Sequence, residues 1–204
     1  ADARITSGWF WGESKKTPKD MKALSEMYFR SVGHNAPLLL NVPPNKEGKV
    51  DQAILNRVTE FGKGIKETFK DNLAKDAKVT ASTVRGNDKK FSPQNVLDGK
   101  DDTYWTVDDN AKTGTLTIDL GGVKAFDVVS VEESIEFGQR IGSYKIEYET
   151  ESGEWKKFDE GKTIGAKRLA RKNTVKGKKV RITVTADDKA EHKVPMLSEI
   201  GVYK

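Results

Sequence analysis

Oxygen-bearing side chains are concentrated in the fifteen residues Ser92–Thr106, which read SPQNVLDGKDDTYWT. Asp98 and Gly99 form a turn signal, because glycine adopts a positive φ at little steric cost. Two more aspartates and two threonines follow, and the rings of Tyr104 and Trp105 can anchor the turn to a core. Carboxylates, hydroxyls and backbone carbonyls suit Ca²⁺, which takes about six to eight oxygen ligands. The stretch therefore predicts a structural cation loop, and the alternative is an unoccupied loop whose aspartates cap turns.

The elements around this loop have the pattern of β-strands. From about residue 71 onward, apolar residues alternate with polar ones, as in strands that bury one face. Glycine-containing turn signals separate these segments. The sequence therefore predicts a β-domain over 71–204, with Trp105 and Trp155 as large core residues. The alternation is clearest at Leu116/Ile118/Leu120, Tyr144/Ile146/Tyr148, Val180/Ile182/Val184 and Ile200/Val202.

Residues 1–70 follow a helical pattern instead. Apolar residues recur at helical spacing in Lys19–Val32 and in Asp51–Phe69, and Asp51 is the expected cap of the second helix. Strands are expected at Arg4–Phe10 and at Leu38–Val42, the latter apolar on both faces like a buried parallel strand. Such a pair of βα units cannot bury itself. We therefore expect residues 1–70 to be the end of a larger domain.

Six separated blocks of the second part resemble the discoidin, or coagulation factor 5/8 type C, domain. They begin at Asn72-Leu73-Ala74 and include the Ser92–Thr106 stretch, TLTIDLGG (115–122), GQRIGSYKIEYE (138–149), KKVRITV (178–184) and LSEIGVY (197–203). The resemblance implies a mainly β chain, in which a jelly-roll β-sandwich covers 71–204. The polar stretch Lys70–Lys78 is then the junction between the two domains.

The same resemblance implies two kinds of binding residue. A structural Ca²⁺ would be held by Asp101 or Asp102, by the carbonyls of Lys100 and Thr103, by Thr106, and by Glu199. Sugars would bind at loops of one end of the sandwich, which here offer Arg85, Asn87, Phe137, Arg140 and His192. The alternative for these loops is packing against a preceding domain, with Glu133 and Gln139 taking part.

A second resemblance covers residues 1–70. The strings GWFW (8–11), SVGHN (31–35) and LLLNVPPNKEGKV (38–50) are similar to the final two βα units of glycoside hydrolase family 29 α-L-fucosidases. The family folds as a (β/α)₈-type barrel and hydrolyses with retention, through an Asp nucleophile and a separate acid/base carboxylate. The resemblance implies that both carboxylates lie upstream of Ala1, so that 1–204 alone should be inactive. It also implies that Trp9 or Trp11 forms a wall of the fucose pocket, the alternative being that these rings fill the barrel top.

Composition narrows the remaining possibilities. The chain has 204 residues, no cysteine and a net charge of +5, and it holds no apolar run long enough for a membrane helix. The absent initial Met suggests a processed or excised piece, and a secreted or cell-surface bacterial location is expected, with the cytoplasm as the alternative. Nine Lys or Arg and no acid occur in 161–186. This stripe favours solvated strand edges over a nucleic-acid surface, since no nucleic-acid fold signature accompanies it.

Three hypotheses follow from these patterns. The first is the C-terminal part of an α-L-fucosidase that acts on fucosylated glycans, with an accessory β-sandwich that binds sugar, such as a galactose-containing glycan, or supports the barrel. The second is a stand-alone, Ca²⁺-containing carbohydrate-binding module with no enzymatic role. The third is an adhesin-like domain with a basic surface. The βα pattern and the LLLNVPP string favour the first, which predicts about 250 or more barrel residues in all.

Overall fold

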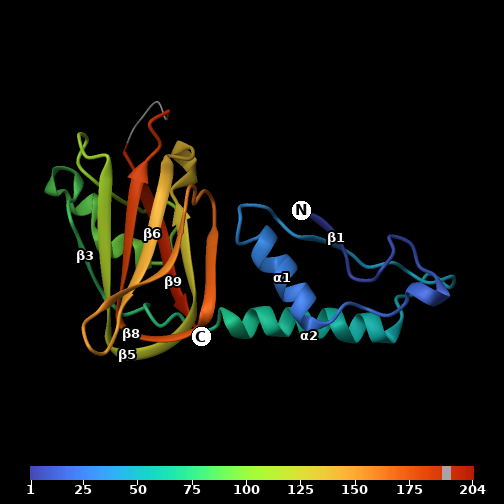
Figure 1. The fold of residues 1–204 in the computed structure, drawn as a ribbon. Helices are drawn as coiled ribbons and strands as arrows, with labels where there is room; N and C mark the ends of the chain where they lie inside the picture. Colours follow the sequence, from blue (N-terminus) through green and yellow to red (C-terminus); the bar gives the residue numbers. More distant parts are fainter. Residues whose placement is uncertain (190–193) are drawn as a thin grey trace. The chain divides into compact units, whose positions relative to one another are not determined.

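A computed structural model describes residues 1–189 and 194–204, and these divide into two compact units, Ala1–Lys70 and Asp71–Lys204. Figure 1 shows helices in the first unit and mainly strands in the second. The division falls where the hydrophobic period changes from helical to alternating. Each unit is described separately below.

The first unit contains two short parallel strands and two helices. Strand β1 (Asp2–Arg4) pairs with β2 (Leu39–Asn41), so that Arg4 lies beside Asn41 at the carboxyl ends. Helices α1 (Met21–Ser31) and α2 (Gln52–Thr68) cover one face of this pair. Between β1 and α1 lie a loop and the short 3-10 helix η1 (Glu13–Lys15). A small core of Ile5, Leu24 and Ile54 joins strands to helices.

Two local predictions for this unit were wrong, and a third was met only in part. The first strand ends at Arg4 rather than at Phe10, because the following residues form the loop that carries the tryptophans. Strand β2 is not buried on both faces, since Leu39 is 70% exposed. Asp51 is the N-cap residue of α2 as predicted, but its side chain makes no capping hydrogen bond. Asp20 caps α1 through the Ala23 N–H at 2.7 Å.

The second unit is an antiparallel seven-stranded β-sandwich, in the order β4-β9-β5-β8-β6-β7 with β3 added beside β5 (Figure 1). Strands β5 (Thr113–Glu133) and β8 (Arg168–Ala186) are long, and their register shifts between Asp119 and Lys124. The halves on either side of that shift pair with different neighbours, and this folds one continuous sheet into two layers. The other strands are β3 (Lys78–Ala81), β4 (Trp105–Thr106), β6 (Ile141–Glu149), β7 (Trp155–Gly161) and β9 (Met196–Tyr203).

The alternating residues predicted from the sequence form the core of the sandwich. Leu116, Ile118, Ile146, Ile182 and Ile200 are fully buried, as the period-2 pattern requires. Trp105 is also fully buried and donates its indole N–H to the Thr83 carbonyl at 3.0 Å. Trp155 was expected in the core but is only half-buried, with the Arg181 guanidinium 4.1 Å from its ring centroid. The short 3-10 helices η2 (Arg85–Asn87), η3 (Lys89–Phe91), η4 (Pro93–Leu97) and η5 (Ile135–Phe137) lie in the loops.

Candidate functional site

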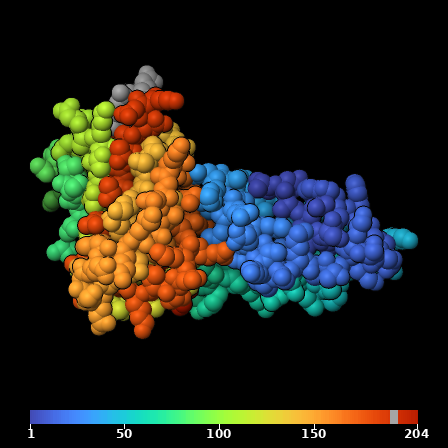
Figure 2. All heavy atoms as spheres, viewed as in Figure 1, coloured from blue at the N-terminus to red at the C-terminus, as the bar shows by residue number. Residues whose placement is uncertain are grey.

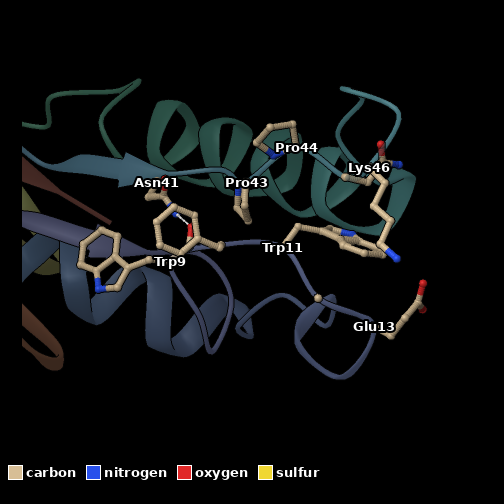
Figure 3. A pocket seen from close by; sticks show the side chains of 10 residues that line it. Trp9, Trp11, Glu13, Asn41, Pro43, Pro44 and Lys46 are labelled. Atoms are coloured by element: carbon tan, nitrogen blue, oxygen red, sulfur yellow. Dashed lines mark hydrogen bonds between the residues drawn. The ribbon is translucent and has the colours of Figure 1, made fainter.

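A hollow of about 750 Å³ opens at the carboxyl ends of β1 and β2 in the first unit (Figure 3). Asn41 is the last residue of β2, and Pro43, Pro44 and Asn45 continue the lining beyond it. The other wall is the loop after β1, which contributes Trp9, Phe10, Trp11, Gly12 and Glu13. Loops at the carboxyl ends of parallel strands are the usual place for a ligand in such folds.

The loop that carries the aromatic residues is held at its base and along its length. The Lys19 ammonium donates to the Arg4 and Thr6 carbonyls at 2.7 and 2.6 Å, which closes the loop back onto β1. Burial, and then the nearby Arg4 cation, lower the pKa of Lys19. The Asn41 side-chain amide donates to the Trp9 carbonyl at 2.8 Å (Figure 3). The hollow therefore has a defined wall.

Both predicted tryptophans, Trp9 and Trp11, line this hollow. The Arg4 guanidinium lies 5.6 Å from the Trp9 ring centroid, and the Trp11 indole N–H donates to an Asp51 carboxylate oxygen at 2.7 Å. Phe10, which was not predicted, also lines the hollow and is 85% exposed. Its position between two tryptophans was the signal for it. Three aromatic residues around an open hollow can pack on the apolar face of a sugar and exclude water from it.

The predicted cation loop is a turn fastened by two carboxylates. Asp98 accepts hydrogen bonds from the Thr103 hydroxyl at 2.8 and 2.9 Å and from the Lys100 N–H at 3.0 Å. Glu199 accepts one from the Gly99 N–H at 3.2 Å, across 100 positions of sequence. Of the residues predicted for this loop, the structure thus brings Glu199 to the turn, whereas the part that Asp98 plays in fastening the turn was not predicted.

The electrostatics of this loop centre on Glu199. Burial raises the pKa of its carboxyl to about 7, the Gly99 N–H opposes that rise, and the charges of Glu132, Asp98 and Asp101 add to it. Three further carboxylates thus act on a half-buried fourth one, which is a surrounding that a cation would stabilise. Of the two predicted aspartates, Asp101 is the one whose charge raises the pKa of Glu199.

The fit to Ca²⁺ depends on backbone oxygens as well. In the part of the chain that the structure describes, no three His, Cys, Asp or Glu side chains form a metal-binding group. The Thr106 hydroxyl is buried and donates to the Pro195 carbonyl at 3.0 Å, which leaves its oxygen lone pairs for a ligand. Glu199, Asp101 and the Lys100 and Thr103 carbonyls fit the oxygen preference of Ca²⁺, in which carbonyls commonly complete the shell.

Aromatic residues also gather at loops of the sandwich. The ring of Tyr104 lies 5.5 Å from that of Phe91 and 5.4 Å from that of Phe137, measured between centroids. Arg85 and Arg140 lie over the outer rings, each with its guanidinium carbon 5.7 Å from the centroid. We call Phe91, Tyr104 and Phe137 the ring cluster. Three of the predicted sugar-binding residues, Arg85, Phe137 and Arg140, are thus brought together.

The remaining predicted sugar-binding residues are placed less clearly. Asn87 is exposed in the turn η2 with a positive φ of 52°, and His192 lies outside the described residues.

Glu133 is only 3% exposed, so it is not available for packing on another domain. It accepts hydrogen bonds from the backbone N–H groups of Arg140 at 2.7 Å, Ile141 at 3.1 Å and Gly165 at 2.6 Å. Glu133 thereby fixes the loop that presents Phe137.

Some basic residues of the 161–186 stripe pair with acids on neighbouring strands. Lys167 pairs with Glu132 at 2.8 Å, Lys179 with Glu149 at 3.1 Å, and Arg181 with Glu147 at 2.8 Å. The residues of this stripe are drawn in orange to red in Figure 2, and at these three places the surface carries charges of both signs. Such pairing argues against a nucleic-acid surface, which needs unpaired cations for the phosphates. Over the described residues no helix is long and apolar enough to cross a bilayer.

An antiparallel β-sandwich with a fastened acidic loop and a ring cluster at its loops places the second unit in the class of β-sandwich modules. The chain belongs to the F5/8 type C domain family, whose model matches residues 78–200.

The full chain is also homologous to the C-terminal part of glycoside hydrolase family 29 α-L-fucosidases. The structure of a GH29 fucosidase from Ruminococcus gnavus in complex with fucose is 59% identical, with a TM-score of 0.95 over 100% of this chain and 40% of that one. Alpha-L-fucosidase 1 of Arabidopsis thaliana is 37% identical over 99% of this chain and 40% of its own length. This chain thus spans about 40% of such relatives. A chitosan-binding module from Paenibacillus, at 22% identity and a TM-score of 0.57, shares the fold.

Proposed function

We propose that this chain acts as the C-terminal part of a retaining α-L-fucosidase, in which residues 1–70 complete the catalytic barrel. The observation that carries the proposal is the aromatic hollow at the carboxyl ends of β1 and β2. In this reading, Trp9 packs against the C5–C6 face of fucose, where a ring excludes water and hydrogen bonds are few. The substrate class is fucosylated glycans, as the fucose complex of the Ruminococcus gnavus relative suggests.

The chemistry itself needs residues beyond those that line this hollow. Retention requires two carboxyl groups about 5–5.5 Å apart, one as nucleophile and one as acid and then base. Among the residues described for the hollow, Glu13 is the one carboxylate, and it pairs with Lys16 at 3.0 Å with 73% of its side chain exposed. Residues 1–204 alone should therefore not hydrolyse fucosides.

Activity measurements on two polypeptides test this proposal. Residues 1–204 should be inactive on an aryl α-L-fucoside, and the polypeptide extended upstream through the barrel should be active. Trp9→Ala in the extended polypeptide should lower kcat/KM about 10- to 100-fold. This is the loss expected when one buried apolar contact with the substrate is removed. Trp155→Ala, the same substitution in the other unit, should leave kcat/KM unchanged. Turnover by repurified 1–204 would contradict the proposal.

A second function is favoured by the ring cluster. We propose that the sandwich binds a neutral hexopyranoside there, with Phe137 packing on the sugar and the Arg140 guanidinium donating to its hydroxyls. Phe137 is 43% exposed, which leaves its ring accessible. Titration of 1–204 with galactosides and fucosides, followed by NMR line broadening, should show binding that Phe137→Ala removes. Ile135→Ala, at a similarly exposed residue of the same loop, is the control.

For the acidic loop we propose a structural Ca²⁺ held by Glu199, Asp101, the carbonyls of Lys100 and Thr103, and Thr106. The cluster of negative charge around Glu199 supports this proposal. A bound divalent cation would neutralise that charge and fix the turn after η4. The measurement that tests it is given in the Discussion.

A further inference from the structure

The loop between β1 and α1 is closed by a single residue, Lys19. Its main-chain N–H donates to the Ile5 carbonyl at 2.7 Å, and its ammonium donates to the Arg4 and Thr6 carbonyls at 2.7 and 2.6 Å. Three consecutive carbonyls at the end of β1 and just beyond it therefore accept hydrogen bonds from one residue. Residues 7–18 form a loop whose two ends meet at these contacts, which is the arrangement of an Ω-loop.

Lys19 is itself held in place by the two helices of this unit. The Arg57 guanidinium, from α2, donates to the Lys19 carbonyl. Lys19 also directly precedes Asp20, the residue that caps α1. Among the described residues no carboxylate pairs with the Lys19 ammonium, so its charge acts on backbone carbonyls. Hydrogen bonds from a charged donor are stronger than those from a neutral one, which suits this ammonium to holding a loop.

Trp9 lies within this loop and is fixed at its backbone and at its ring. The Asn41 side-chain amide donates to the Trp9 carbonyl at 2.8 Å (Figure 3). The Arg4 guanidinium lies 5.6 Å from the Trp9 ring centroid, while the Arg4 carbonyl accepts from Lys19. A shift of the loop relative to β1 would therefore move the ring within the hollow. The Trp9 residue is 44% exposed, so part of its ring is open to a ligand.

We propose that Lys19 is a positioning residue, whose ammonium keeps the loop closed and thereby sets where Trp9 meets the sugar. This inference rests on the proposed function, in which Trp9 packs on fucose. Lys19 is not among the residues that line the hollow, so it acts on a ligand through the loop rather than by contact. Without the ammonium, two carbonyls lose this donor, and one main-chain hydrogen bond from residue 19 remains to close the loop.

Kinetics of the polypeptide extended upstream through the barrel test this role. Lys19→Met keeps the length of the side chain and removes the ammonium. It should raise KM for an aryl α-L-fucoside about three- to tenfold and leave kcat within about twofold, because it weakens a contact made equally in the ground state and the transition state. Lys22→Met, a matched change at an exposed lysine of α1, should alter neither constant.

A double-mutant cycle separates positioning from a general loss of stability. If Lys19 acts through Trp9, adding Lys19→Met to Trp9→Ala should lower kcat/KM by less than about twofold beyond Trp9→Ala alone, because the ring that Lys19 positions is already absent. Independent roles would instead multiply the two losses. Multiplied losses would therefore overturn the proposal, and so would an unchanged KM for Lys19→Met.

Hydrogen exchange of 1–204, followed by mass spectrometry, gives a readout that does not depend on activity. Lys19→Met should speed the exchange of amides in 7–18 about tenfold relative to Lys22→Met, and should leave the amides of α2 unchanged. Unchanged exchange in 7–18, or equal acceleration in α2, would contradict a local closing role for Lys19. If Lys19→Met does not fold, Lys19→Gln takes its place, since its side chain is neutral and shorter.

Failure of the proposed function looks different from failure of this inference. In that case the unaltered extended polypeptide would not hydrolyse the fucoside at all. Exchange in 1–204 would still show whether the Lys19 ammonium closes the loop that carries Trp9.

Discussion

Among single residues, Asp51 shows how a carboxylate can be diverted from a local to a distant partner. It stands directly before α2, where a side chain commonly accepts a hydrogen bond from the first turn. Its two oxygens instead accept from Trp11, 40 positions away, at 2.7 Å and from Asn45 at 3.0 Å. These two hydrogen bonds hold the pKa of Asp51 below its ordinary value.

The stability that Asp51 contributes should therefore depend on acid. Because its pKa is lowered in the folded state, the contribution is complete above the ordinary aspartate range, at about pH 5, and is lost as pH falls below about 4. Thermal unfolding of 1–204 should show a lower Tm for Asp51→Asn at pH 7 and a narrowing difference below about pH 4. Glu47→Gln, in the same exposed loop, should give a small, pH-independent difference. A constant gap for Asp51→Asn from pH 7 to 3 would contradict this assignment.

At the scale of elements, loops in this chain are fixed by carboxylates whose partners lie far away in sequence. Glu133 ends β5 and binds three backbone N–H groups, one just before β6, one at the first residue of β6 and one in the turn before β8. Asp108 similarly binds the Thr83 hydroxyl at 2.5 Å and the Gly86 N–H at 2.8 Å, which orders the turn η2. The loops of the ring cluster are thus shaped by buried or anchored side chains rather than by their own sequences.

Removing the Glu133 carboxylate should be costly. Glu133→Ala leaves three N–H groups without their acceptor, and each buried unsatisfied group costs about 1–3 kcal/mol. We expect urea unfolding of 1–204 to give a free energy of unfolding at least about 3 kcal/mol lower. Glu133→Gln keeps one acceptor oxygen and should lose less, and the exposed Glu136→Ala should change little. If Glu133→Ala matched Glu136→Ala, the hydrogen bonds would have no part in fixing the loop.

The acidic loop gives a prediction on cation removal. Ca²⁺ should raise the Tm of 1–204 and EDTA should lower it, because a ligand that binds only the folded state stabilises that state by mass action. Glu199→Gln should reduce the response to both, since it removes the half-buried carboxylate at the centre of the charge. Glu151→Gln, in an exposed turn, is the matched control. If neither Ca²⁺ nor EDTA changed the Tm, the loop would bind no structural cation and the proposal would be wrong.

The sequence predicts features that depend on neighbouring residues, and it misses those that depend on contacts between residues distant in the chain. The sandwich strands were predictable, because alternation is local and Leu116, Ile118 and Ile182 obey it. That Trp9 and Trp11 line a pocket was predicted from the family resemblance, because no local sequence pattern places an aromatic ring in a hollow. Glu133 was misjudged because its partners lie up to 32 positions away. Hydrogen bonds across such distances leave no periodic trace in a single sequence.

On the scale of the whole molecule, the two units differ in how well each is buried. The sandwich has one large core that includes Trp105, Phe126 and the alternating strand residues. The first unit fully buries Ile5, Leu24 and Ile54, while Phe10 is 85% and Leu39 70% exposed. An exposed apolar stripe on a small unit is unfavourable in water. We therefore expect the sandwich to be the more stable of the two.

Limited proteolysis of 1–204 measures this difference. Trypsin should cut first after the exposed Lys70, because residues 72–74 are already fastened to β9 by the Asn72 side chain and the Leu73 N–H. The product Asp71–Lys204 should persist while 1–70 is degraded, as mass spectrometry would show. Degradation of both parts at one rate would mean that the two units unfold together.

The fastening of residue 72 to the last strand has a consequence for how this module can be used. Asn72 accepts from the Val202 N–H at 3.0 Å, and Leu73 donates to the Val202 carbonyl at 2.8 Å. The first and last residues of the sandwich therefore lie next to each other. A part built in this way can be spliced into a surface loop of an unrelated host, or appended at either end, without stretching the host. The hydrogen bond between Asn72 and β9 keeps the two ends of the sandwich together, and this allows the module to be inserted into or joined to other proteins.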